Sequence, residues 1–235
     1  MAKSTDITLY TANTMNGWKP LIFLHESEVD YELVPISFAK REQKEPWYLK
    51  LNPNGRIPAI VDHGNNHFAV FESGAILWYL AEKYSKFLSK DPNLRSETLQ
   101  WLMFQMGGIG PMMGQAMYFQ RIAKPNGNEE PYSIRRYVEE SRRLLEVLNT
   151  RLAGRQFLVG DEYSIADMAT YPWARSHFWA TVSVEGLDHL NTWLDRLDAR
   201  PRTQEALQLP EPRPSVFGDG DIDEAAQKNA ANFKD

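Results

Sequence analysis

Hydrophobic positions in the first third of the chain alternate between two periods. Short runs rich in β-branched and aromatic residues predict strands over residues 7–11, 31–36, 57–61 and 68–71. Apolar residues at helical spacing predict helices over 21–28 and 72–84, with one or two helical turns over 45–51. The order is βαβ, then α, then ββα, and its first unit implies parallel strands joined by a crossover helix.

The pattern becomes helical throughout in the middle and later parts of the chain. One helical stripe is formed by Val138, Ser141, Leu145, Leu148 and Leu152. The run from Ser164 to Asp167 has the form of a capping box, in which the Ser164 hydroxyl caps the Asp167 amide and the Asp167 carboxylate returns to Ser164. These signals predict a domain made only of helices.

The polar, turn-prone residues 89–93 mark a change of composition between the two patterns. We therefore expect an α/β domain over residues 1–88 and an all-helical domain over residues 93–209. Residues 210–235 are rich in Pro, Gly, Asp and Asn, and they are expected to form a loosely held tail.

The absence of cysteine restricts the chemistry most. None of the 235 residues is Cys, so no disulfide, cysteine-ligated zinc or protein thiol nucleophile can form. Sulfur chemistry would have to come from a bound small molecule. The five histidines have no metal-ligand spacing, and we expect no metal.

Charge and hydropathy restrict the classes of partner that the chain is expected to have. The net charge is −5, without a block of Lys and Arg, so nucleic acid is not an expected partner. No run of about 18 apolar residues predicts a membrane span. Residues 1–6 lack the apolar core of a signal peptide, and a cytoplasmic location is expected.

A proline stands just before the third predicted strand, in the run from Asn54 to Val61. Pro58 cannot donate to a strand ladder. One solution is a cis Ile57–Pro58 bond in a tight turn, which would leave the Ile57 amide and carbonyl to pair with an extended, peptide-like ligand. The other is a trans proline at the start of an edge strand.

A strand gives way to a helix at Phe71-Glu72-Ser73-Gly74. Free amides and the helix dipole make such a helix start a carboxylate site, where Ser73 would hold a carboxylate and Glu72 an ammonium group. Together they would fit the α-amino-acid head of a γ-glutamyl group. A simple helix N-cap is the alternative, because Ser and Glu are common there.

The two motifs in this order, followed by the helical half with its capping box, resemble a cytosolic glutathione transferase. The resemblance covers about residues 7–207 and implies a thioredoxin-like N-terminal domain with an all-α C-terminal domain. Four further runs resemble the nu-class bacterial enzymes and their fungal relatives: Thr14-Met15-Asn16-Gly17-Trp18-Lys19, Leu99-Gln100-Trp101, Gly107-Gly108-Ile109-Gly110-Pro111-Met112 and Tyr132-Ser133-Ile134-Arg135-Arg136-Tyr137. This chain departs from that group in having Met15 where Pro is usual.

The resemblance implies glutathione as cosubstrate, a homodimer and a set of site residues. Asn16, assisted by Thr14, would meet the glutathione sulfur and lower its pKa from about 8.5 by hydrogen bonding to the thiolate. The other glutathione-binding positions would be Gln43 at the glycine carboxylate, Ile57 and Pro58 at the cysteinyl unit, Glu72 and Ser73 at the γ-glutamyl head, and Arg136 near or across a dimer interface.

A second, apolar substrate needs apolar walls. The candidates are Trp18, Met113, Met117, Tyr118, Trp173 and His177. The alternative is helix core, and we expect about half of them to be core. The glycines among residues 107–114 would either kink their helix or allow close backbone approach.

Three reactions stay open for a glutathione-dependent enzyme of this kind. They are conjugation of an apolar electrophile as in detoxification, disulfide reduction by two glutathiones, and double-bond isomerisation by reversible thiol addition in fungal secondary metabolism. A non-catalytic regulatory glutathione-binding protein is the alternative from another class.

Overall fold

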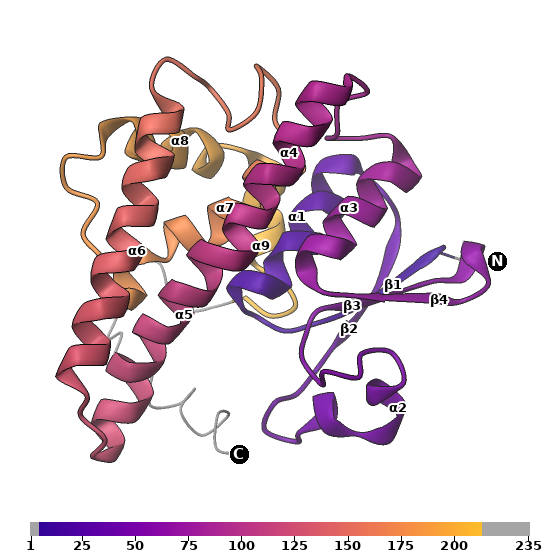
Figure 1. Ribbon diagram of the computed structural model, residues 1–235. Coiled ribbons are helices and arrows are strands. Elements are labelled where there is room, and N and C mark those ends of the chain that lie inside the picture. Colours follow the sequence, from indigo (N-terminus) through magenta and orange to yellow (C-terminus); the bar gives the residue numbers. More distant parts are fainter. Residues whose placement is uncertain (1–4, 213–235) are drawn as a thin grey trace. The chain divides into compact units, whose positions relative to one another are not determined.

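The computed structural model describes residues 5–212 and divides them into two compact units (Figure 1). The first unit contains residues 5–89 and 198–212, and the second contains residues 90–197. The predicted combination of an α/β unit and a helical unit is confirmed. Residues 213–235 of the predicted tail lie outside the described residues.

A four-stranded mixed sheet is the centre of the first unit. Its strands are β1 (Ile7–Thr11), β2 (Tyr31–Pro35), β3 (Ala59–Asp62) and β4 (Phe68–Phe71), in the order β2-β1-β3-β4. β1 and β2 are parallel, whereas β3 is antiparallel to both β1 and β4. The parallel pair expected from the βαβ pattern is confirmed.

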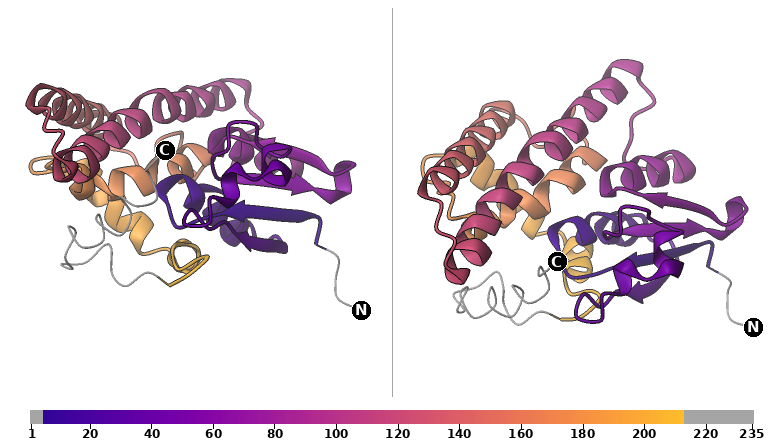
Figure 2. Two further views of the ribbon diagram at one scale, coloured as in Figure 1. Left: turned by 90° about the horizontal axis from the view of Figure 1, so that it is seen from below. Right: turned by 60° about the horizontal axis from the view of Figure 1, so that its bottom comes forward.

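Three helices accompany the sheet between the first strand and the end of the α/β segment. They are α1 (Met15–Ser27), α2 (Pro46–Leu49) and α3 (Ser73–Tyr84). Within this unit, α1 and α3 pack together on one face of the sheet, and α2 lies on the other (Figures 1 and 2). A short 3₁₀ turn, η1 (Glu42–Lys44), precedes α2.

Helix α1 begins six residues before the predicted start at Leu21, at Met15. The sequence pattern favoured a later start because residues 13–17 are turn-rich and the apolar helical spacing begins at Leu21. Here the Thr14 side chain accepts a hydrogen bond from the Gly17 amide and caps the helix earlier. Pro20 therefore lies inside the helix, where it cannot donate to the Asn16 carbonyl.

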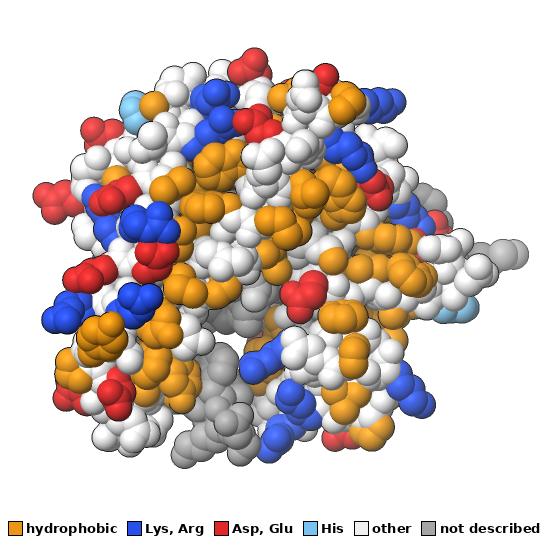
Figure 3. Space-filling model, viewed as in Figure 1, with side chains coloured by type: hydrophobic (Ala, Val, Ile, Leu, Met, Phe, Trp, Pro, Cys, Tyr) orange, Lys and Arg blue, Asp and Glu red, His pale blue; other side chains and the backbone are white. Residues whose placement is uncertain are grey.

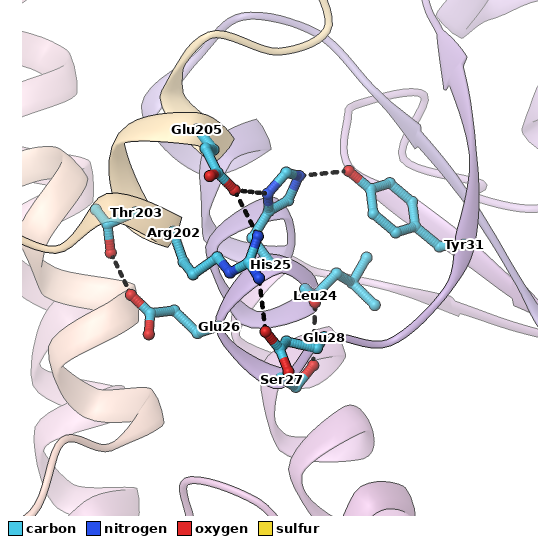
Figure 4. A network of polar contacts seen from close by, with 9 residues as sticks. All are labelled: Leu24, His25, Glu26, Ser27, Glu28, Tyr31, Arg202, Thr203 and Glu205. Atoms are coloured by element: carbon cyan, nitrogen blue, oxygen red, sulfur yellow. Dashed lines mark hydrogen bonds and ion pairs between the residues drawn. The ribbon is translucent and has the colours of Figure 1, made fainter.

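Helix α9 (Pro201–Leu207) was expected in the helical domain, and that part of the predicted boundary is wrong. It packs along α1 in the first unit. Arg200 forms a paired contact with Glu26 at 2.6 and 2.8 Å. Figure 4 shows Arg202 donating to Glu28 at 2.6 Å and Thr203 donating to Glu26 at 2.8 Å.

His25 extends this network toward the sheet. Its ring contacts the Glu205 carboxylate of α9 at 3.5 Å through Nδ1 and the Tyr31 hydroxyl of β2 at 3.0 Å through Nε2 (Figure 4). Hydropathy could not place α9, because these contacts join polar groups far apart in sequence.

The second unit is built from helices joined by short connections. In chain order they are α4 (Pro92–Phe104), the π-helical turn η3 (Gln105–Ile109), α5 (Gly110–Tyr118), the π-helical turn η4 (Phe119–Ala123), η5 (Lys124–Asn126), α6 (Pro131–Leu152), α7 (Ile165–Arg175), η6 (His177–Ala180) and α8 (Asp188–Asp198). No helix among residues 5–212 has both the length and the apolar character that crossing a bilayer requires.

The predicted capping box opens α7 and is confirmed. The Asp167 carboxylate is fully buried and accepts four hydrogen bonds. Their donors are the Leu158 amide at 3.0 Å, the Ser164 amide at 3.1 Å, the Ser164 hydroxyl at 3.0 Å and the Trp193 indole at 3.0 Å. One side chain thereby joins α7, α8 and the loop before α7.

Candidate functional site

The ends of three neighbouring strands lie at one edge of the sheet. Tyr10, near the end of β1, is opposite Ala59 at the start of β3, and Ala59 is opposite Phe71 at the end of β4. The segments that follow β1, precede β3 and follow β4 therefore meet at this edge. These segments contain Thr14 and Asn16, Ile57 and Pro58, and Glu72 and Ser73.

The segment after β1 turns directly into the N-terminus of α1. The Thr14 hydroxyl oxygen accepts the Gly17 amide at 3.0 Å. Thr14 and Asn16 are half-buried at the start of the helix. A helix N-terminus favours negative charge, so an anionic sulfur near Thr14 and Asn16 would be stabilised by the dipole as well as by side-chain donors.

Gly17 allows α1 to approach the end of β1 closely. A Cβ atom at this position would lie 2.1 Å from the Ala12 carbonyl oxygen and 2.6 Å from the Thr11 hydroxyl. The Thr11 hydroxyl also donates to the Gly17 carbonyl at 3.2 Å. Only glycine fits here, and its absence of a side chain sets the position of the helix start.

The Ile57–Pro58 peptide bond is cis, one of the two sequence-based alternatives. The preceding loop is held by two side chains that donate to the Arg56 carbonyl, Tyr48 at 2.8 Å and Asn52 at 2.7 Å. The Asn52 side-chain oxygen also accepts the Asn54 amide at 3.0 Å. This loop fixes the backbone of Ile57.

Ile57 lies just outside the sheet, two residues before the start of β3. The pairing of β3 with β1 ends at Ala59, and Pro58 has no amide hydrogen. Within residues 5–212 the Ile57 amide and carbonyl take part in no backbone–backbone hydrogen bond. Both groups are placed where an extended peptide could pair with them.

Ser73 and Glu72 begin α3. Ser73 is buried, whereas Glu72 is exposed and has φ 70° and ψ 118°, in the positive-φ region that L residues rarely adopt. The Glu72 side chain does not cap the helix. Glu72 therefore does not form the simple side-chain N-cap that was the alternative to a ligand-binding role.

Lys19 of α1 reaches the same helix start. Its side chain is 0% exposed, and its ammonium group donates to the Ser73 hydroxyl at 3.2 Å. Burial lowers the pKa of Lys19 to about 7, although the nearby Glu72 carboxylate opposes this shift.

Gln43 is buried in η1. Within residues 5–212 its side-chain oxygen makes no hydrogen bond. A buried amide oxygen without a partner is costly unless a water or ligand supplies one. This oxygen suits a donor group, whereas a carboxylate would need the amide nitrogen of Gln43, so the predicted contact with the glycine carboxylate stays a prediction.

Two of the predicted apolar-site residues belong to the core, and those predictions are wrong. Trp18 and Met113 are both 0% exposed, so neither presents surface to a substrate. Trp173 is 8% exposed and packs over α5, where Cβ atoms at Gly110 and Gly114 would each lie 3.5 Å from its ring. A distance of 3.5 Å is an ordinary van der Waals contact, so both predicted roles of these glycines, a kink or close backbone approach, stay predictions.

The other predicted apolar-site residues keep accessible surface in the second unit. Met117 is half-buried and Tyr118 is 43% exposed. His177 is half-buried, and its Nδ1 lies 2.7 Å from the Val182 carbonyl, which fixes Nδ1 as the donor. Burial lowers the pKa of His177, so its neutral form is favoured.

Arg136 is exposed on α6 among side chains of both charges. On the face shown in Figure 3, basic and acidic side chains alternate where α6 runs. On the same helix, Arg143 is paired with Glu140 at 2.6 Å. The predicted contact of Arg136 with glutathione stays a prediction.

Known protein families match both units. The family described as "Glutathione S-transferase, N-terminal domain" matches residues 5–82, and "Glutathione S-transferase, C-terminal domain" matches residues 112–201. The chain belongs to the glutathione S-transferase family. The predicted thioredoxin-like fold and the predicted enzyme class, a glutathione transferase, are confirmed.

Individual relatives are similar to this chain over most of their own length. The Escherichia coli disulfide-bond oxidoreductase YfcG is 44% identical over 86% of this chain and 94% of its own. A Pseudomonas putida glutathione transferase, with one glutathione disulfide bound per subunit, has a TM-score of 0.83 and 41% identity over 89% of this chain and 94% of its own. A Pseudomonas fluorescens family member with two glutathione bound has the same TM-score and identity, over 89% and 96% of the two chains.

The sequence analysis did not predict three residues that support this candidate site, Lys19, Tyr48 and Asn52. Lys19 carries the one signal that could have revealed it, a lone charge in the apolar run from Trp18 to Leu24. Tyr48 and Asn52 hold the loop before Pro58 through bonds to a backbone carbonyl. Hydrogen bonds from a side chain to a backbone carbonyl produce no recognisable pattern in the sequence.

Proposed function

We propose that this chain binds glutathione at the sheet edge of its first unit and uses the glutathione thiolate against a small apolar electrophile or disulfide. The observation that carries the proposal is the meeting of two helix N-termini and the loop around the cis Ile57–Pro58 bond at that edge. Together these segments offer separate donors and acceptors along the length of an extended tripeptide.

Each part of glutathione has complementary groups. Ser73 and the amides that begin α3 suit the γ-glutamyl carboxylate, and Glu72 suits the γ-glutamyl ammonium group. The Ile57 backbone suits the cysteinyl unit, and the side-chain NH2 of Gln43 would donate to the glycine carboxylate. Asn16 and Thr14, at the start of α1, would then meet the sulfur and stabilise its thiolate.

Disulfide reduction is the reaction we favour. The chain has no cysteine, so electrons for a disulfide must come from two glutathione molecules. The similarity to YfcG, described as a disulfide-bond oxidoreductase, and to a protein with two glutathione bound supports this choice. We propose placement in the nu-class and fungal subgroup as well.

Conjugation, double-bond isomerisation and a non-catalytic regulatory role remain the alternatives. In the second unit, Met117, Tyr118, Trp173 and His177 are the proposed apolar substrate residues. A homodimer is proposed as well, and the exposed Phe68 and Phe71 on the edge strand β4 are consistent with one.

Glutathione should raise the melting temperature of the protein in a concentration-dependent way, because it binds only the folded state. Ser73→Ala should weaken this effect by about tenfold in apparent affinity, the scale of one charge-assisted hydrogen bond. Differential scanning fluorimetry across a glutathione series measures both. A series without any rise would refute the proposed glutathione site.

Asn16→Ala should slow turnover near pH 7 and shift the rate profile to higher pH. The lost hydrogen bond to the thiolate is worth about 1 to 3 kcal/mol, equivalent to roughly 1 to 2 units in the thiol pKa. The pH dependence of kcat/KM measures this shift. An unchanged profile would assign thiol activation to Thr14 or to the helix dipole instead.

Mass spectrometry of the glutathione pool distinguishes the reactions. Disulfide reduction yields the oxidised dimer, conjugation yields an adduct, and isomerisation leaves the glutathione concentration unchanged. A small mixed disulfide, a chlorinated nitroaromatic and a conjugated polyene ketone are the trial substrates. Turnover without glutathione would refute the mechanism, whereas tight binding without turnover of all three would favour the regulatory role.

A further inference from the structure

A buried lysine lies behind the proposed γ-glutamyl position and has no role in the mechanism above. Lys19 is on the second turn of α1, is 0% exposed and donates from Nζ to the Ser73 hydroxyl at 3.2 Å. Charged lysine is almost never fully buried without a compensating interaction. Its place against Ser73, at the start of α3, indicates a function at that helix end.

We propose that Lys19 is a positioning residue of the glutathione site, which orients the Ser73 hydroxyl toward the γ-glutamyl carboxylate and takes up a proton when that carboxylate binds. The inference rests on the proposed function, because it requires glutathione at the start of α3.

The hydrogen-bond chemistry of the pair gives the mechanism. An ammonium group has three donors and no acceptor, so the Ser73 oxygen must accept from Lys19, and the hydroxyl hydrogen is directed away from Nζ. A neutral amine has a lone pair, so it can instead accept the Ser73 hydrogen. Protonation of Lys19 therefore selects the orientation in which Ser73 can donate to a carboxylate.

Burial makes this proton exchangeable near neutral pH. The pKa of Lys19 is lowered to about 7, chiefly by desolvation. The neutral and the charged form of Lys19 are then both accessible near neutral pH in the ligand-free protein. A bound carboxylate adds negative charge beside Nζ and raises this pKa, so a proton moves from the buffer to Nζ.

Charged groups lie on the elements that pack against α1. Glu72, at the start of α3, favours the charged amine. Farther along α3, Lys83 is bound to Asp62 of β3 at 2.7 Å. On α9, Arg200, Arg202 and Glu205 contact Glu26, Glu28 and His25 in the last turns of α1.

Isothermal titration calorimetry with S-methylglutathione tests the proposal, because this ligand has no ionisable thiol. Measurements at one pH in buffers of different ionisation enthalpy give the number of protons taken up. We expect a fractional proton uptake near pH 7 that becomes smaller toward pH 5.5, where more of Lys19 is already charged. Affinity should fall as the pH rises from 6 to 8.

Lys19→Met removes the charge and keeps the length of the side chain. It should abolish the proton uptake and weaken S-methylglutathione binding by at least tenfold. Lys50→Met, at an exposed lysine of the same unit, is the matched control and should change neither. Circular dichroism and thermal melting show whether each variant is folded.

Each outcome has a distinct meaning. Failure of the wild-type protein to bind S-methylglutathione would refute the proposed function itself. Binding without proton uptake at pH 7, or an uptake that Lys19→Met retains, would overturn the role of Lys19 and leave the glutathione site intact. Should Lys19→Met not fold, the uptake of the wild-type protein between pH 5.5 and pH 8 decides.

Discussion

Replacing Asp167 with alanine should lower the free energy of unfolding by about 3 to 5 kcal/mol, a large part of the stability of an average domain. The substitution leaves four donors, from Leu158, Ser164 and Trp193, without their acceptor in a fully buried place. A buried donor that loses its acceptor costs about 1 to 3 kcal/mol, and four neighbouring losses are less than additive.

Urea denaturation of Asp167→Ala and Asp167→Asn measures this cost. The Asn variant keeps one carbonyl oxygen for the Leu158 amide and the Trp193 indole, so it should be intermediate. Asp161→Ala, at an exposed aspartate of the same loop, is the control and should change stability by less than about 0.5 kcal/mol. A loss below about 1 kcal/mol in Asp167→Ala would show that the network is dispensable.

Gly17→Ala should destabilise the first unit by about 3 kcal/mol and remove glutathione binding. The added Cβ would lie 2.1 Å from the Ala12 carbonyl oxygen, a backbone atom that cannot rotate away. Helix α1 must therefore move off the end of β1. The movement breaks the bond between the Thr14 hydroxyl and the Gly17 amide and displaces Asn16 from the sulfur position.

Gly107→Ala provides the comparison for this substitution, because a Cβ there would meet no atom within 4 Å. Alanine is better than glycine in a helix by about 1 kcal/mol, so Gly107→Ala should be neutral or stabilising. Equilibrium unfolding and glutathione-dependent melting of both variants measure the contrast. Native stability and normal glutathione binding in Gly17→Ala would contradict the steric argument.

The hydrophobic periods were sufficient to predict the sheet and most helices. The strands of the first unit are short β-branched runs, and the capping box at Ser164 uses neighbouring residues. In both cases the signal is local. Local chemistry also identified Glu72 and Ser73 as the start of a helix.

Long-range packing explains what the sequence did not reveal. Trp and Met side chains are common both in ligand pockets and in cores. Only the burial of Trp18 and Met113 in the folded chain shows that they belong to the core. Lys19 resembles a surface residue until Ser73, 54 positions later, is placed beside it. The assignment of α9 to the first unit likewise depends on partners on α1.

The return of α9 to the first unit has a consequence for the nascent chain on the ribosome. Strands β1 to β4 and helices α1 to α3 leave the exit tunnel early, but the side chains that pair with Glu26 and Glu28 are translated only after the whole helical unit. The α1 surface that α9 covers therefore stays uncovered while the whole helical unit is synthesised. The first unit is therefore completed only after the helical unit has been synthesised, and chains released before residue 200 would be natural targets for quality-control proteases.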